Sequence, residues 1–188
     1  MYYCKWNIYF WLVLAILALL SSCEPENETI PSVYYDTDSF IQEEISYLAE
    51  QVSHLNKHLV LNGVAERVDS IKVDSTSFKE LASLFKQANI NKVIYQDEYQ
   101  TDTFWILDPV TQENIEVVNY TTNKPKLKVK WLQVYSNGSL KASLQGHNFL
   151  FSYEKEVYYQ KLSRFSVISW QKTIGQDTIH VHNEVDYL

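Results

Sequence analysis

The residues best suited to chemistry lie close to the C-terminus, in the stretch HVHNE at positions 180–184. In a strand, the alternation of side chains would place His180, His182 and Glu184 together on one face. Two imidazoles and a carboxylate are a usable zinc ligand set. The competing interpretation is the water-facing side of an antiparallel strand, which commonly carries polar residues. We favour the solvated strand and keep the metal site as the weaker alternative.

No other stretch has the spacing of a known catalytic or cofactor motif. The sequence contains no G-x-S-x-G, no phosphate-binding loop, no H-E-x-x-H and no C-x-x-C. His54 and His58 are four residues apart, but the pair straddles the expected end of a helix, so we interpret it as a solvated terminus. We therefore predict a protein that is not an enzyme and holds no cofactor. A metal-dependent enzyme using the set at positions 180–184 is the remote alternative.

The two cysteines are Cys4 and Cys23, and the second one ends an apolar run. Residues 8–20 are uninterruptedly apolar, Lys5 precedes them, and Ser21 and Ser22 follow. A positive start, a short apolar core and small residues at its exit are typical of a secretory signal peptide. A membrane-spanning helix needs about 20 apolar residues, which is more than this run provides.

The tetrad Leu20-Ser21-Ser22-Cys23 resembles the lipobox of bacterial lipoproteins. The resemblance implies that residues 1–22 are removed as a signal peptide and that the Cys23 sulfur carries a diacylglyceryl group. A further fatty acyl chain, such as palmitate, would be added to the new amino terminus. We therefore expect a lipid-anchored protein of the bacterial outer membrane, on either its periplasmic or its cell-surface side.

Residues 23–35 are predicted to be the lipidated cysteine and a flexible acidic tether. This stretch contains two prolines and three glutamates and has too little apolar surface to fold. Removing residues 1–22 also removes Lys5, so the formal net charge of −7 becomes −8. An acidic protein is a poor general partner for nucleic acid. The expected partner is the membrane, reached through Cys23, and an envelope protein or a small apolar ligand is left open.

Residues 36–188 are predicted to form one α+β domain. Apolar residues at three- and four-residue steps indicate helices over about 38–55 and from Ser77 to Asn89, where Ser77 and Glu80 fit a capping box. Asn62-Gly63 and Asn137-Gly138 are typical centres of tight hairpin turns. Strands are expected over the following ranges: 59–61, 64–73, 104–107, 115–120, 126–135, 139–145, 148–153, 157–162, 165–174 and 178–187.

The short connections between these strands leave no room for parallel crossovers. We therefore expect a curved antiparallel meander, similar to a half-barrel, packed on two helices from the N-terminal half. Alternation along 126–131 would place Leu127, Val129 and Trp131 on one face. Four lysines would form a solvated stripe on the other side: Lys124, Lys126, Lys128 and Lys130.

The stretches YDTDSFIQEEISYL, FKELASLFKQANINK and NFLFSYEKEVYY are similar to those of small Bacteroidota lipoproteins without an assigned activity. The expected arrangement also resembles, in architecture only, the LolA/LolB type of lipoprotein carrier and receptor. That resemblance implies a large apolar cavity lined by residues such as Trp105, Trp131 and Phe151. We predict a non-enzymatic lipoprotein that binds a partner or acts in the envelope, with a LolA/LolB-like carrier of acyl chains or lipoproteins as the alternative.

Overall fold

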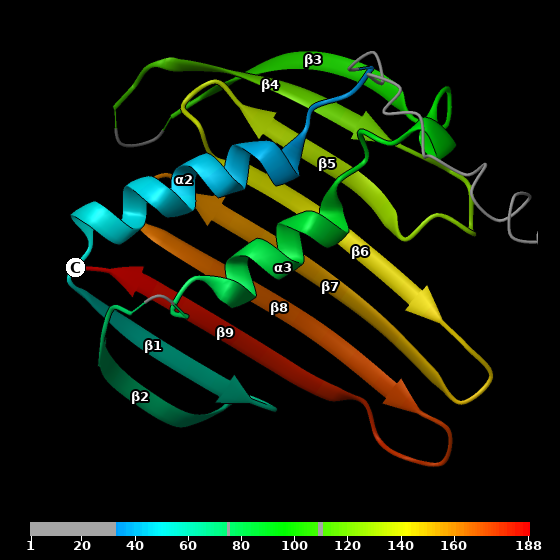
Figure 1. The fold of residues 1–188 in the computed structure, drawn as a ribbon. Helices are drawn as coiled ribbons and strands as arrows, with labels where there is room; N and C mark the ends of the chain where they lie inside the picture. Colours follow the sequence, from blue (N-terminus) through cyan, green and yellow to red (C-terminus); the bar gives the residue numbers. More distant parts are fainter. Residues whose placement is uncertain (1–32, 75, 109–110) are drawn as a thin grey trace, which may run out of the picture. The chain divides into compact units, whose positions relative to one another are not determined.

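The computed structural model describes residues 33–74, 76–108 and 111–188, with backbone only for residues 66–69 (Figure 1). The proposed signal peptide, Cys23 and most of the acidic tether lie outside these ranges. The described part is α+β, with two helices and an antiparallel sheet of nine strands that does not close. Tyr34 is buried in the core, so the folded domain includes residues just before position 36.

The two helices are α2 (Thr37–Gln51) and α3 (Lys79–Ala88), and they pack beside each other on one face of the sheet (Figure 1). Asp36 caps α2, because its Oδ1 accepts hydrogen bonds from the backbone N–H groups of Asp38 and Ser39. The helix α3 ends at Asn89, as predicted. The predicted capping box is wrong, because the Ser77 hydroxyl contacts Asp74 and lies in a turn that precedes the helix.

The sheet is an antiparallel meander from β3 to β9, extended at the β9 edge by the hairpin of β1 and β2. Its spatial order is β2-β1-β9-β8-β7-β6-β5-β4-β3, which leaves β2 and β3 as the edges. A short helix, η1 (Val93–Tyr95), precedes β3. The strands are β1 (His54–Leu61), β2 (Val64–Lys72), β3 (Gln100–Leu107), β4 (Asn114–Thr121), β5 (Val129–Tyr135), β6 (Leu140–His147), β7 (Phe151–Gln160), β8 (Arg164–Thr173) and β9 (Ile179–Tyr187).

Two predicted boundaries are wrong because pairing between strands overrides local pattern. The first helix ends at Gln51, and residues 54–61 are a strand that pairs with β2 on one side and with the C-terminal β9 on the other. The two strands predicted over 148–153 and 157–162 are one strand, β7, whose middle pairs with both β6 and β8. For β1 the partner β9 is distant in sequence, whereas β6 and β8 flank β7 directly.

A register shift in β5 reverses the predicted orientation of Trp131. Val129 pairs with Leu144, and Trp131 pairs with the adjacent Ser143, so β5 has a bulge between Val129 and Trp131. Val129 and Leu132 therefore both face the helices and are buried. Trp131 lies on the opposite face, where the Lys141 ammonium sits 5.5 Å from its ring centroid.

The two Asn-Gly turns differ. Asn62 and Gly63 both have positive φ, as a type I′ turn requires. At the second turn only Gly138 does, and its N–H donates to the Tyr135 carbonyl, so that hairpin uses a longer loop.

The covered face of the sheet, defined as the face under the helices, holds the main core. Ile41 and Leu48 from α2, Phe85 from α3 and Tyr159 from β7 are all fully buried there. The Tyr159 hydroxyl donates to Glu44 Oε2 at 2.6 Å, which ties α2 to the sheet. Burial and the adjacent Glu44 carboxylate raise the pKa of Tyr159 well above its usual value, so the hydroxyl stays protonated.

We expect Asp36→Ala to lower the free energy of unfolding by about 1–2 kcal/mol, because the cap of α2 and a contact to α3 are both lost. Asp36 Oδ1 also accepts from Asn89 Nδ2 at 2.9 Å. Burial alone would raise the pKa of Asp36, but the hydrogen bonds from Ser39, Asp38 and Asn89 outweigh it and lower the pKa below 3.8.

The stabilisation by this carboxylate is therefore present above its unfolded-state pKa and is lost as pH falls through the lowered value. Urea unfolding of the unaltered protein and of Asp36→Ala at pH 7 and at pH 3 measures this effect. The difference in their free energies of unfolding should be smaller at pH 3 than at pH 7. An equal difference at both pH values would contradict the stabilising role of the carboxylate.

Candidate functional site

The open face of the sheet, defined as the face turned away from the helices, is the candidate functional site. Most of its side chains are half-exposed, and it carries both aromatic rings and charges. Ile106 of β3 and Ile168 of β8 line one cavity on this face although four strands separate them in the sheet. The sheet therefore curls toward its open face, and Ile115 and Val117 of β4 are buried on that side.

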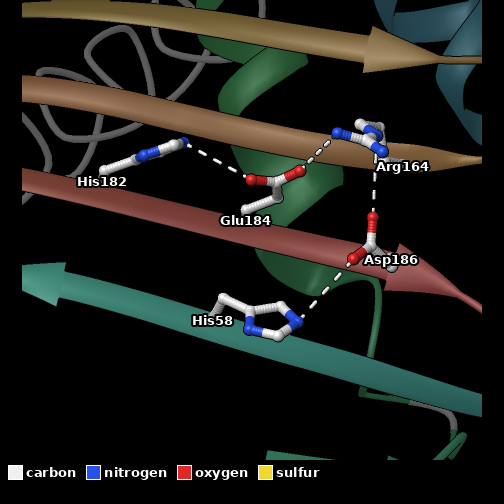
Figure 2. A network of polar contacts seen from close by, with 5 residues as sticks. All are labelled: His58, Arg164, His182, Glu184 and Asp186. Carbon is white, nitrogen blue, oxygen red and sulfur yellow. Dashed lines mark hydrogen bonds and ion pairs between the residues drawn. The ribbon is translucent and has the colours of Figure 1, made fainter. Parts of the chain in front are cut away.

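One half of the open face is a chain of ion pairs across β8, β9 and β1 (Figure 2). The Arg164 guanidinium lies between two carboxylates, with Nη1 2.6 Å from Glu184 Oε1 and Nε 3.6 Å from Asp186 Oδ1. Each carboxylate also faces an imidazole: His182 Nε2 is 3.8 Å from Glu184, and His58 Nε2 is 3.8 Å from Asp186. Figure 2 shows the five side chains linked in one continuous series that turns at Arg164, and we call this series the row.

The chemistry open to this row is limited, because Arg164 already occupies both carboxylates. Of the candidate metal residues, His182 and Glu184 are neighbours, whereas the His180 ring stacks on Trp170 with centroids 5.2 Å apart. In the part of the chain that the structure describes, no group of three His, Cys, Asp or Glu side chains is placed to hold a metal ion. The row is suited to fixing the register of β8, β9 and β1.

We expect zinc at micromolar concentration to produce no heat of binding, since a zinc ion would have to displace Arg164 from Glu184. Calorimetric titration of the full chain measures this. The matched variant is Arg164→Met, which frees both carboxylates and should cost less than about 1 kcal/mol of stability, as exposed ion pairs do. Binding by the unaltered protein that disappears in His182→Ala would restore the metal site.

The other half of the open face is a groove of about 400 Å³. Its walls come from five strands and comprise two tyrosines, two isoleucines and three polar residues: Tyr135, Tyr158, Ile106, Ile168, Lys141, Glu156 and Ser166. Burial raises the pKa of both Tyr135 and Tyr158, so their hydroxyls are neutral hydrogen-bonding groups. The Tyr135 hydroxyl donates to Gln133 Oε1 at 2.9 Å, and Lys141 Nζ lies 3.9 Å from Glu156.

The remaining residues singled out by sequence do not meet in one place. Leu20, Ser21, Ser22 and Cys23 lie outside the described residues. The helix-terminus interpretation of His54 and His58 is wrong, since both lie on β1, where His54 contacts Ser53. Of the lysine stripe, Lys124 pairs with Glu98 and Lys130 donates to two backbone carbonyls, while Lys126 and Lys128 are exposed in the loop before β5.

The side chains expected to line a carrier cavity are also dispersed. Trp105 is exposed on edge strand β3, and Trp131 points to the open face because of the bulge. Phe151 lies at the far end of β7 and packs on Tyr153. Beneath α2 the covered face is filled by the side chains of the core.

Sequence reasoning missed the groove residues and Arg164. Tyr158 follows the buried Val157 in a strand whose alternation is readable, so its outward orientation was predictable. Its convergence with Ile106 was not, because that contact depends on how far the sheet curls.

Comparisons with known proteins do not assign a family. No family model and no curated protein match the sequence. Among solved structures, the chain is similar to the S-type phycobiliprotein lyase CPES from Guillardia theta, with 9% sequence identity and a TM-score of 0.26. The match covers 87% of this chain and 97% of that one. At this level of similarity, function has to be argued from the residues themselves.

Within the described ranges, no helix is long and apolar enough to cross a bilayer.

Proposed function

We propose that the protein is a lipid-anchored, non-enzymatic binding module of the bacterial envelope that takes a small planar amphipathic ligand in the groove of its open face. The groove carries this proposal. Its volume of about 400 Å³ lies in the range of small-molecule sites, which are mostly apolar with a few placed polar groups.

The lining residues suggest how the ligand would lie. Tyr158 and Ile168 from neighbouring strands, with Ile106 opposite, offer flat apolar contacts on both sides of a ring. Lys141 and Ser166 offer a positive charge and a hydroxyl, which suit an acidic or carbonyl-bearing edge of the ligand. The anchor rests on the lipobox resemblance of residues 20–23.

The groove is tested with anilinonaphthalene sulfonate, a planar apolar probe that carries one anionic group. We expect its fluorescence to rise on saturable binding to the full chain at micromolar concentration. Tyr158→Ala and Ile168→Ala each remove about 1.5–3 kcal/mol of apolar contact, which would weaken binding roughly tenfold or more.

The matched control is Lys155→Ala, on the covered face of the same strand as Tyr158. It should bind the probe as the unaltered protein does. Equal binding by all variants, or no saturable binding at all, would remove the groove as a ligand site. Circular dichroism of each variant separates these results from unfolding.

A LolA/LolB-like carrier has less support. The covered face beneath α2 is filled, its three expected lining residues are dispersed, and the larger cavity beside α3 is lined mostly by polar side chains.

A further inference from the structure

Two neighbouring turns at one end of the sheet expose large apolar side chains. The turn between β6 and β7 carries Phe149 and Leu150, which are 87% and 59% exposed, and the turn between β8 and β9 carries Ile174, which is 62% exposed. The two turns touch, since the Ile174 N–H donates to the Leu150 carbonyl at 3.0 Å. They form a continuous apolar tip, defined by these three residues.

The chain enters the domain at the same end of the sheet. The Tyr34 hydroxyl contacts the backbone of Tyr99, whose own hydroxyl donates to the carbonyl of Val129 at the start of β5. Val129 pairs with Leu144, near the end of β6, and the turn bearing Phe149 follows that strand. Even fully extended, the proposed tether from Cys23 to Val33 would span at most about 35 Å. The lipid anchor would therefore stay within that distance of the point of entry at this end of the sheet.

Further exposed apolar residues lie near the point of entry. Val93 and Ile94 of η1 are more than half exposed. The helix is held there by Tyr95, whose ring packs edge-on against that of Tyr99.

Several backbone groups of the apolar tip already have hydrogen-bond partners within the protein. Asn148 Oδ1 accepts from the N–H groups of Leu150 and Phe151 at 2.9 and 2.8 Å, and the Asn148 N–H donates to the Phe151 carbonyl. The Ile174 N–H is bonded as well. Groups bonded in this way do not pay the cost of leaving water, which is otherwise several kcal/mol for each unsatisfied group in a membrane.

Exposed lysines surround this end and suit the headgroups of anionic lipids. Lys126 and Lys128 lie in the loop before β5, Lys172 lies near the end of β8, and Lys92 precedes η1. Juxtamembrane basic residues contribute about 1 kcal/mol each near an anionic surface. Carboxylates at the same end include Asp97, Glu98, Asp102, Glu154 and Asp177, of which Glu98 is already paired with Lys124 and Glu154 with the Gln145 amide.

We propose that this end of the domain rests on the lipid bilayer, with the apolar tip inserted at the interface between headgroups and acyl chains. This rests on the proposed lipid anchor. A short tether and an inserted apolar tip at the same end of the domain would together hold it in a fixed orientation. The opposite end of the sheet, at Leu162 and Leu188, would then point away from the membrane.

Spin labelling of the lipidated mature chain tests the proposal. Its one native cysteine would be blocked by lipid, so a nitroxide reagent reacts only with an introduced thiol. The two variants are Leu150→Cys in the apolar tip and Leu188→Cys at the opposite end, two positions that are each 59% exposed. Both proteins are placed in floated vesicles of phosphatidylethanolamine and phosphatidylglycerol.

The expected result is that collisions of a polar nickel complex with the label at position 150 fall roughly tenfold on vesicle binding, while oxygen remains accessible. The label at position 188 should be unchanged. Equal access of nickel to both labels, or spin–spin broadening at position 150 that reports a second copy, would overturn the proposal. If the protein does not float with vesicles, the result contradicts the proposed lipid anchor, and the proposed orientation on the membrane is overturned as well.

Discussion

Replacing Cys23 with alanine is expected to transfer the protein from the membrane fraction to the aqueous fraction. A lipid chain stabilises attachment by about 0.8 kcal/mol for each buried methylene, so the loss of two or three chains removes essentially all of the binding free energy of the anchor. The apolar tip alone offers three side chains and cannot replace them. Fractionation of cells with high-salt washing, followed by mass measurement of the mature chain, checks the result.

The control for this experiment is Ser22→Ala, which keeps a small residue before the cysteine and should leave processing and membrane attachment unchanged. An unmodified mass for the native chain, or firm membrane retention of Cys23→Ala, would contradict the lipidated anchor. In either case the roles of the groove and the apolar tip would have to be reconsidered for a protein without a lipid anchor.

The second large effect is expected in the core, where Tyr159→Phe should lower the free energy of unfolding by about 2–3 kcal/mol. The substitution removes the hydroxyl that donates to the Glu44 carboxylate at 2.6 Å, and hydrogen bonds to charged groups contribute about 1.5–3 kcal/mol. Glu44 is mostly buried, so water replaces the lost partner poorly. Lys161 Nζ remains 3.4 Å from Glu44 and limits the loss.

A double variant distinguishes this cause from simple loss of packing. In Tyr159→Phe/Glu44→Leu neither partner is left with an unmade hydrogen bond, so much of the lost stability should return. Tyr158→Phe, the adjacent residue on the open face, is the matched single control and should change stability by less than about 1 kcal/mol. Urea unfolding measures all of them. A double variant no more stable than Tyr159→Phe would show that the carboxylate is not the reason.

The architecture was predictable wherever local chemistry decides the backbone. Asn62-Gly63 tolerates positive φ at both positions and formed the expected turn. Apolar spacing and Asn89 set the face and the end of α3. Because the connections after η1 are too short for crossovers, the strands had to form an antiparallel meander.

Predictions failed where the pairing between strands decides the conformation. The apolar spacing up to Leu55 predicts a helix over about 38–55, yet the helix ends at Gln51 and residues 54–61 form strand β1, because β9 and β2 supply hydrogen bonds on both sides. The bulge before Trp131 left no signal in the alternation, since it arises from the register between β5 and β6. Intrinsic propensity is a weak prior, and the pairing of a strand on both of its sides overrides it.

The sequence by itself determined the class of the fold, because short turns between strands and an apolar helix face are local patterns. The proposed membrane anchor likewise depends only on a local resemblance, that of residues 20–23 to a lipobox. The sequence also excluded the common catalytic motifs. The groove, the row of ion pairs around Arg164 and the apolar tip were decided only by the tertiary structure. Each of these three features joins residues from strands or turns that are separated along the chain. The two walls of the groove meet because the sheet curls, and no single stretch of sequence encodes that curl.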